Sequence, residues 1–273
     1  MKRLLIALAL CIAAALALAG YSYREAMRDP VVREASLSLP GWPEGAAPVK
    51  VVLISDLHIG SVAMGAERLT RIVSQINALK PDLVVIAGDF ISGHAANSAA
   101  RIGEPMVAPL SGLKPPLGVV AALGNHDHWT GGAATRALLQ RAGVTVVDND
   151  AVQRGPLAIG VVGDEPTRND DIPAALAAMA KLPGGRLMLS HSPDIFPDLP
   201  ADTVLLAGHT HCGQLVLPLF GPLAEVSDFG ARYRCGLVRE RKGVVVVTAG
   251  LGTSVIPLRL GAPPDLWLLT LGK

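Results

Sequence analysis

The fold is decided by the stretch Val51-Val52-Leu53-Ile54-Ser55-Asp56-Leu57-His58, a short apolar run that ends in polar side chains. A short, continuous apolar run is typical of a strand buried on both faces of a parallel sheet. Because such runs alternate with helix-like stretches along the chain, the sequence predicts an α/β domain. Five runs have this form, and polar residues follow each at once: Val51–Ile54, Leu83–Ala87, Val119–Leu123, Leu187–Leu189 and Val204–Ala207.

The polar residues after these runs lie where α/β proteins build their sites. Ligands bind beyond the carboxyl ends of the strands in such sheets. Asp56 and His58 are two positions apart, so an extended segment projects both from one face, and His209 and His211 repeat that spacing. We therefore expect one site formed by these two pairs together with the clusters Gly88-Asp89, Gly124-Asn125-His126-Asp127 and Ser190-His191.

The side chains that these clusters supply are carboxylates, an amide and imidazoles. Mixed oxygen and nitrogen donors suit Mn, Fe or Zn better than Ca or Mg. Seven candidates exceed one tetrahedral ion but fit two ions that share a carboxylate. Two ions about 3.5–4 Å apart form the clamp used for in-line displacement at phosphorus, with a bridging hydroxide as the nucleophile. The seven candidates are Asp56, His58, Asp89, Asn125, His191, His209 and His211.

The five clusters, in this order, resemble the signature of the calcineurin-like metallophosphoesterase superfamily over about residues 49–273. The resemblance implies a four-layer α/β/β/α sandwich of two mixed sheets, preceded here by an N-terminal apolar helix. It also implies which ligands serve each ion: Asp89 bridges, the first ion takes Asp56, His58 and His211, and the second takes Asn125, His191 and His209.

Two further residues resemble the catalytic groups of that superfamily. His126 would stabilise the transition state or protonate the leaving oxygen, and Asp127 would orient the imidazole of His126. The segment Gly88–Ser92 lacks the second Asp-Arg-Gly of the Ser/Thr protein phosphatases, which makes a phosphoprotein phosphatase a poor match. The apolar N-terminus and the segments His211–Gln214 and Gly250–Arg259 are instead similar to small bacterial membrane-associated phosphohydrolases.

Residues 1–23 contain an uncharged apolar run, Leu4–Gly20, behind two basic residues. A spanning helix needs roughly 17–25 apolar residues, and Tyr21 and Tyr23 lie where interfacial aromatics anchor a helix end. We expect a single-pass anchor in the cell inner membrane, with an extracytoplasmic domain because the basic start favours a cytoplasmic N-terminus. The competing interpretation is a signal cleaved at Ala17-Leu18-Ala19, which would leave a secreted or periplasmic protein.

The rest of the chain divides into a connector and one domain. Residues 24–47 are rich in proline and form the connector, with an edge strand expected at Ala35–Leu39. Residues 48–273 form the metallophosphoesterase domain, which is long enough for one large core. Lys and Arg number 24 against 23 Asp and Glu, and aromatics are only 4% of residues. Nucleic acid is therefore not an expected partner.

The predicted function is a binuclear-metal phosphohydrolase, in the first place a phosphodiesterase acting at a membrane. Its substrate would be a phosphate ester or pyrophosphate that could be lipid-linked. One alternative is a pyrophosphatase acting on a lipid-linked nucleotide such as UDP-diacylglucosamine, which we would expect on the cytoplasmic face. A non-enzyme alternative is a membrane- or cell-wall-associated metal-binding protein. The presence of His126 and Asp127 argues against it, because a binder needs no leaving-group acid.

Several remaining residues have two interpretations each. Cys212 and Cys235 could form a disulfide that holds the downstream loop over the site in an oxidising compartment, or they could be unlinked small residues. His94 could touch substrate, although we expect it to be solvated, and His128 could contact substrate because it follows the catalytic pair. Three arginines could clamp a phosphate or could be ordinary surface charges: Arg232, Arg234 and Arg259.

Overall fold

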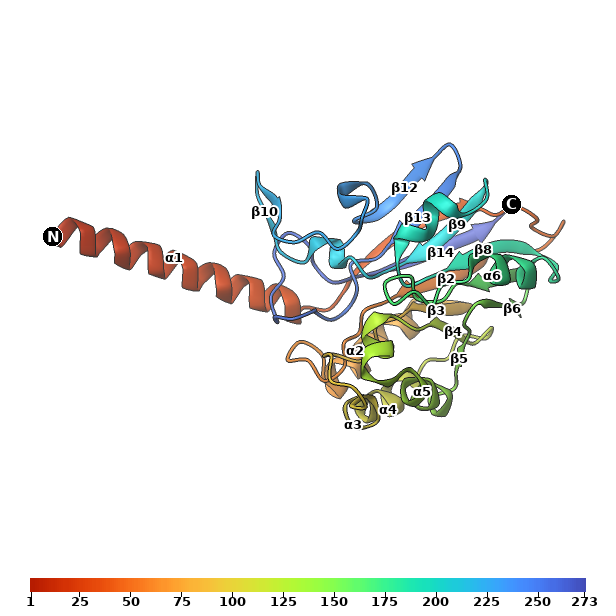
Figure 1. The fold of residues 1–273 in the computed structure, drawn as a ribbon, viewed down its shortest axis with the longest axis horizontal. Helices are drawn as coiled ribbons and strands as arrows, with labels where there is room; N and C mark the ends of the chain where they lie inside the picture. The colour runs from red at the N-terminus through yellow and green to blue at the C-terminus, as the bar shows by residue number, and fades with distance from the viewer.

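Two mixed six-stranded sheets form the centre of the molecule in the computed structural model, which describes residues 1–273 (Figure 1). The first sheet has one antiparallel junction, between its second and third strands, and is otherwise parallel. Its order is β1 (Val31–Ser38), β14 (Asp265–Gly272), β2 (Val49–Ile54), β3 (Leu83–Ala87), β4 (Val119–Ala122) and β5 (Val144–Val146).

The second sheet has a parallel centre between two antiparallel edge strands. Its order is β12 (Gly236–Glu240), β13 (Gly243–Val247), β9 (Thr203–Ala207), β8 (Gly185–Leu189), β7 (Leu157–Val161) and β6 (Asp150–Arg154). All five apolar runs singled out in the sequence form strands, namely β2, β3, β4, β8 and β9, with only Leu123 lying beyond the end of its strand. A separate two-stranded hairpin consists of β10 (Val216–Leu217) and β11 (Gly221–Pro222).

Side chains alternate along the central strands and fill two different layers of the core. In β2, Val52 and Ile54 belong to the cluster beneath the helices, whereas Val51 and Leu53 belong to the cluster between the sheets. Leu189 and Leu206 meet that same inner cluster from the second sheet. Because every second residue of a strand points to the same face, a strand buried on both faces must be apolar throughout. This is why the runs are continuous.

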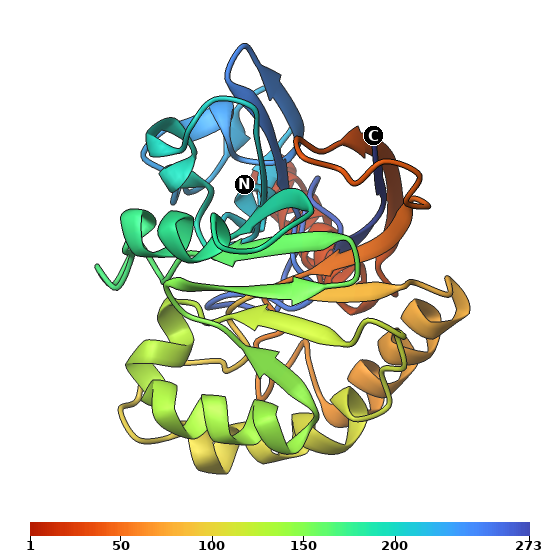
Figure 2. The ribbon, with the colours of Figure 1, turned by 90° about the vertical axis from the view of Figure 1, so that its right-hand side faces the viewer.

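Helices cover the outer face of each sheet and complete four layers, which confirms the predicted architecture (Figure 2). The first sheet is covered by α2 (Ala66–Ala78), α3 (Ala99–Gly103), α4 (Val107–Leu110) and α5 (Asn125–Arg141). The second is covered by α6 (Ile172–Met179) and the 3₁₀ segment η2 (Pro193–Asp198). Shorter 3₁₀ turns are η1 (Glu104–Met106), η3 (His211–Gly213) and η4 (Gly230–Arg232).

The N-terminal helix α1 (Lys2–Met27) projects from one end of the molecule and is long and apolar enough to cross a membrane (Figure 1). It extends beyond residue 23, where we expected the segment to end. The connector also requires a correction, because β1 pairs with β14 over its whole length, from Val31 opposite Asp265 to Ser38 opposite Gly272. The edge strand therefore starts at Val31 rather than Ala35, and the folded domain starts before residue 48.

Candidate metal centre

The loops after β2, β3, β4, β8 and β9 meet where the carboxyl ends of the two sheets come together. The backbone nitrogen of Asp56 donates to the carbonyl of Gly88 at 2.9 Å, which joins the loops after β2 and β3. The backbone nitrogen of His209, after β9, donates to the Asp56 carboxylate at 3.0 Å and joins the two sheets. All seven predicted ligands lie within this junction.

The local backbone at the centre is unusual. Asp56, His58, Asp89, His209 and His211 all have positive φ, between 47° and 70°. Residues other than glycine rarely adopt this conformation, and it clusters at functional sites because the surrounding structure must hold it. Here the strand ends turn sharply, so that each side chain points back toward the junction instead of continuing along its sheet.

One half of the centre gathers around His58. Its Nε2 atom lies 3.1 Å from Nε2 of His211, 3.6 Å from the Asp89 carboxylate and 3.9 Å from Oδ1 of Asp56. The Nε2 atom of His211 is also 3.4 Å from Oδ1 of Asp56. All four side chains are buried. Ligand atoms of Asp56, His58 and His211 all lie within 4.8 Å of one another, as the predicted first ligand set requires, and Asp89 adjoins them through His58.

The other half gathers around His191. Its Nε2 atom lies 3.0 Å from Oδ1 of Asn125, 3.1 Å from Nδ1 of His209 and 3.4 Å from the Asp89 carboxylate. The Nδ1 atom of His191 donates to the carbonyl of Ala87 at 2.7 Å. Since a carbonyl can only accept, this bond leaves the lone pair of a neutral ring on Nε2, which faces the other ligand atoms.

These contacts fit a pair of cations. Lone pairs of nitrogen and oxygen approach one another in both halves, an arrangement that a cation between them would stabilise. Oδ1 of Asp56 is buried and accepts no hydrogen bond, although buried polar atoms are nearly always satisfied. The second oxygen of Asp56 is held by Ser55 and by the backbone of His209, so Oδ1 alone is directed at the cluster. The Asp89 carboxylate lies 3.6 Å from His58 in one half and 3.4 Å from His191 in the other, so it adjoins both halves.

The pKa values at the centre suit metal ligands, because the imidazoles of His58 and His209 stay neutral and keep a lone pair, while other groups retain a proton. Burial raises the pKa of Asp56 to about 7, and burial lowers the pKa of His58 to about 4 and that of His209 to about 3. Burial also acts to lower the pKa of His191, but the charges of Asp89 and Asp56 outweigh it and raise this pKa well above its usual value. A metal ion could replace the proton that the site otherwise retains.

His126 lies beside this cluster at the first turn of α5. Its backbone nitrogen donates to Oδ1 of Asp89 at 2.9 Å, and its ring lies 4.7 Å from that of His58, measured between centroids. The Nδ1 atom donates to the carbonyl of Gly93 at 2.9 Å, which leaves Nε2 as the atom for proton exchange. A ring nitrogen of His126 also lies within 4.8 Å of ligand atoms of His58 and Asp89.

The expected role of Asp127 is wrong. Its carboxylate does not contact the His126 ring and instead accepts three backbone N–H groups, from Phe90 at 2.9 Å, Ile91 at 3.1 Å and Gly124 at 3.0 Å. The bond to Gly124 is one half of a capping box at the start of α5. Asp127 therefore holds two site loops together, while a backbone carbonyl orients the imidazole.

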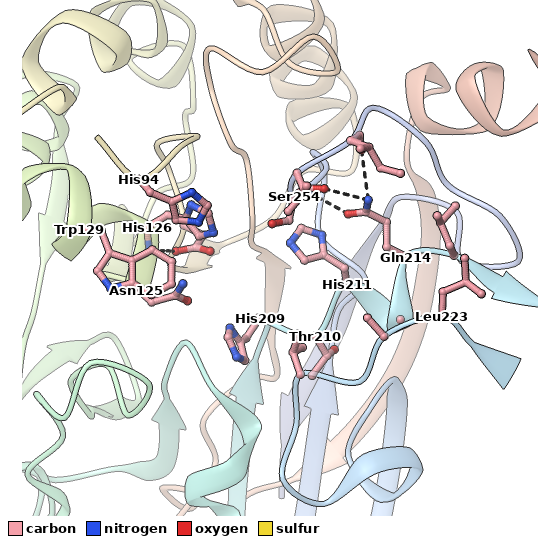
Figure 3. A pocket seen from close by; sticks show the side chains of 17 residues that line it. His94, Asn125, His126, Trp129, His209, Thr210, His211, Gln214, Leu223 and Ser254 are labelled. Carbon is pink, nitrogen blue, oxygen red and sulfur yellow. Dashed lines mark hydrogen bonds between the residues drawn. The ribbon is translucent and has the colours of Figure 1, made fainter. Parts of the chain in front are cut away.

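A cavity of about 470 Å³ opens beside the centre (Figure 3). Its lining includes Asp89, Asn125, His126, His209 and His211, together with two further aromatic groups, of which the sequence indicated only the second. These are Trp129, whose ring centroid is 5.0 Å from that of His126, and His94, at 4.7 Å from the same ring. Trp129 is three residues after His126 on a helix, a spacing that could have indicated a shared face.

The cysteines and arginines have structural roles. Cys212 and Cys235 form a disulfide with 4.7 Å between their Cα atoms, which ties the downstream loop to the turn that carries His211. Arg259 is fully buried and donates to four backbone carbonyls, those of Ala249, Gly250, Gly252 and Ala262, and to Nδ1 of His211. It therefore cannot clamp a phosphate in the cavity.

Two other arginines are paired at the surface, and one histidine lies away from the opening. Arg232 binds Glu240 at 2.7 Å, and Arg234 forms an ion pair with Glu225, so neither is a free phosphate clamp. His128 does not line the cavity, whereas His94, which we expected to be solvated rather than to touch substrate, does.

Comparison with other proteins gives the same assignment as the geometry. A model of the calcineurin-like phosphoesterase family matches residues 49–213. The uncharacterized metallophosphoesterase YkuE of Bacillus subtilis is 30% identical over 263 residues, which cover 92% of this chain and 90% of that protein. The phosphodiesterase YaeI of Escherichia coli is 30% identical over 262 residues, covering 85% and 89%.

A vertebrate relative extends the likeness to membrane proteins. The transmembrane protein with metallophosphoesterase domain of Danio rerio is 31% identical over 281 residues, covering 95% of this chain and 61% of that protein. Fold, site and relatives together define a metal-dependent phosphoester hydrolase. The chain belongs to the calcineurin-like phosphoesterase family.

Proposed function

We propose that this chain is a phosphodiesterase whose centre holds two metal ions, Mn, Fe or Zn. The observation that carries the proposal is the convergence of six side chains around the carboxylate of Asp89, beside a cavity that His126 also lines. The ligands to one ion are Asp56, His58, His211 and Asp89, and those to the other are Asn125, His191, His209 and Asp89.

The residues of the chain divide the work of hydrolysis. Two bound ions would polarise the phosphoryl oxygens and lower the pKa of the attacking water. Water adds to phosphorus, the bond between phosphorus and the leaving oxygen breaks, and that oxygen takes a proton from Nε2 of His126. The carbonyl of Gly93 orients His126 for this transfer through Nδ1. Removing such an acid typically lowers the rate by 10²–10⁴-fold.

A diester is favoured over the alternatives by several observations. The relative from Escherichia coli is named a phosphodiesterase. The cavity beside the ligands has a volume of about 470 Å³ and apolar residues in its lining, which suits a phosphate that carries organic groups. His126 lies beside the ligand cluster with Nε2 unused, which a protein that only stored metal would not require.

The location we propose is outside the cytoplasm, with α1 as a single-pass anchor. The disulfide between Cys212 and Cys235 supports this side, because disulfides persist in oxidising compartments. The same observation disfavours a lipid-linked nucleotide such as UDP-diacylglucosamine, for which we expected a cytoplasmic site. Membrane fractionation with N-terminal sequencing tests the anchor, because cleavage after Ala19 would release a soluble protein.

The test of the activity uses the full chain in detergent, since β1 belongs to the first sheet and cannot be removed safely. The protein is stripped with a chelator, reloaded with Mn, Fe or Zn, and assayed with bis(p-nitrophenyl) phosphate. We expect activity in the wild type, loss of metal in Asp89→Asn, and retained metal with a rate lowered at least about 100-fold in His126→Ala. Two bound ions without hydrolysis of any ester or pyrophosphate would refute the enzyme.

A further inference from the structure

An exposed apolar surface surrounds the mouth of the cavity. We call it the apolar rim, and its residues belong to two segments, the β10–β11 hairpin with the loop after it and the loop before Arg259. The cavity is lined by four of its six members. The members, with their exposed fractions, are Leu219 (102%), Phe220 (86%), Leu223 (64%), Val226 (51%), Val255 (90%) and Ile256 (40%).

The chain around the rim is nearly free of charge. No charged residue occurs from Gln214 to Ala224, and the next one, Glu225, is paired with Arg234. Exposed apolar patches of this kind are rare on soluble proteins and mark surfaces that meet another apolar partner. We therefore expect the partner of the apolar rim to offer an apolar, uncharged environment for these large side chains.

The rim is held rigidly in its exposed position. Val255 has φ of 62° and Leu219 has φ of 71°, a conformation that costs energy for any residue with a side chain and most for a β-branched one. Gln214 fixes the loop of Val255, since its Nε2 donates to the carbonyls of Ser254 at 3.0 Å and Ile256 at 3.2 Å (Figure 3). The loop of Val255 is therefore both strained and exposed, and the Val255 side chain adds nothing to the core.

The rim lies at the same end of the molecule as α1, at the level where its apolar run ends. The carbonyl of Ser22 accepts from the backbone nitrogen of Arg259 at 2.9 Å, three residues after Ile256. Ser22 stands between Tyr21 and Tyr23, the aromatics at the helix end. Figure 1 shows the β10 hairpin reaching toward the side from which α1 projects. A bilayer spanned by Leu4–Gly20 would therefore have its surface at the rim.

The junction between helix and domain is short and clamped, so this placement does not depend on a flexible linker. Only three residues separate Met27, the end of α1, from Val31 at the start of β1. The side chains of Arg68 and Gln75 on α2 donate to the carbonyls of Arg28 at 2.8 Å and Pro30 at 3.0 Å. The direction of α1 therefore fixes the face that the domain turns toward the bilayer.

We propose that the apolar rim inserts into the interfacial layer of the bilayer that α1 crosses, and that the catalytic cavity opens onto this layer to take an amphiphilic phosphate diester. The apolar part of the substrate lies against Leu223, Val226, Val255 and Ile256, which line the cavity, while the phosphate reaches the metal centre at its floor. The substrate half of this statement rests on the proposed phosphodiesterase, whereas the membrane half does not.

The membrane half is tested by fluorescence quenching on the full chain in phosphatidylcholine nanodiscs that contain 5-doxyl phosphatidylcholine. Phe220→Trp places a reporter on the rim, Lys181→Trp places one after α6 at the opposite end, and the wild type supplies the background of the native tryptophans. We expect the added emission at 220 to be quenched at least about twofold more strongly than that at 181. Equal quenching of the two reporters overturns insertion of the rim and indicates a partner other than lipid.

The substrate half is tested with two esters that share one leaving group. In nanodiscs, kcat/KM is measured for p-nitrophenyl hexadecyl phosphate and for bis(p-nitrophenyl) phosphate, and the two are compared as a ratio. We expect Val255→Ser with Phe220→Ser to lower this ratio about tenfold through lost apolar contact, and Val255→Ile to preserve it.

The outcomes separate the two proposals. Wild type that hydrolyses neither ester refutes the phosphodiesterase. Wild type that hydrolyses the soluble ester while the ratio stays unchanged in the serine variant overturns the amphiphilic substrate and leaves the phosphodiesterase intact. A ratio that falls in the serine variant and is retained in Val255→Ile supports the rim as the surface that selects the substrate.

Discussion

Replacing Asp127 by Asn separates a structural role from a catalytic one. The two carboxylate oxygens accept three buried backbone N–H groups, two on Oδ1 and one on Oδ2. Asn retains one acceptor, so its amide nitrogen must face the N–H of Gly124 and leave both donors without partners. Each unsatisfied buried donor costs roughly 1–3 kcal/mol. We therefore expect the free energy of unfolding to fall by about 3 kcal/mol.

The assay is thermal unfolding of the metal-loaded protein in detergent, read beside the hydrolysis rate. A loss of about 3 kcal/mol lowers Tm by roughly 6–12 °C in a protein of this size. His126→Ala is the matched control, because it removes the imidazole and leaves the three N–H bonds in place. Below the unfolding temperature, Asp127→Asn should retain far more activity than His126→Ala.

The contrary result is equally specific. If Asp127 acted by orienting His126, then Asp127→Asn would leave Tm within about 1 °C of the wild type and lower the rate by a factor near that of His126→Ala. It would also have no further effect on the rate once His126 was already Ala. That combination would refute the structural reasoning, which predicts that the loss of Tm persists in the double variant.

Three further changes test other parts of the centre. In chelator, Tm should fall as pH rises from about 7 to 8.5, because the folded protein retains protons on Asp56, whose pKa burial raises to about 7, and on His191, while the unfolded chain has lost them. His58 and His209, whose pKa burial lowers, are neutral in both states over this range and do not oppose the fall. Added Mn²⁺ should remove the fall, and a flat profile in chelator would contradict it. Cys235→Ser removes a disulfide between residues 23 apart and should lower the free energy of unfolding by about 3 kcal/mol. Dithiothreitol should lower the stability of the wild type by the same amount and leave that of the variant unchanged. Gly88→Ala should abolish metal binding measured by mass spectrometry, since its Cβ would lie 2.8 Å from Nδ1 of His191, whereas Gly45→Ala, with a similar φ but open space, should bind normally.

The sheet cores could be predicted because burial on both faces leaves a continuous apolar signal. Leu83–Ala87 matches β3 residue for residue, and Thr203 is the only addition to the predicted run in β9. The first edge strand carried a weaker signal. In β1, buried Leu37 alternates with exposed Glu34 and Ser36, and its extent is set by pairing with β14 more than 200 residues away. That pairing has no local signature, so its start at Val31 was missed.

The site divides in the same way. Metal ligands are recognisable because their residue types are restricted and each follows a strand. The groups that orient a catalytic side chain are not recognisable in the same way, since a carboxylate next to a histidine in sequence can point elsewhere. Asp127 follows His126 directly, yet as the third residue of a helix its side chain turns back to the N-terminal amides. Helix geometry, rather than sequence distance, decided which group orients the imidazole.

The apolar rim cannot be recognised from amino-acid composition. Half of all residues are hydrophobic, and an average of that kind does not distinguish a core strand, a spanning helix and an exposed loop. Val245 in β13 and Val255 in the rim are the same residue ten positions apart, one fully buried and the other 90% exposed. What separates them is the ladder partner that β9 provides to the first and that nothing within the chain provides to the second. An apolar side chain that the fold holds outward under strain, beside a helix able to cross a membrane, points to a partner outside the chain.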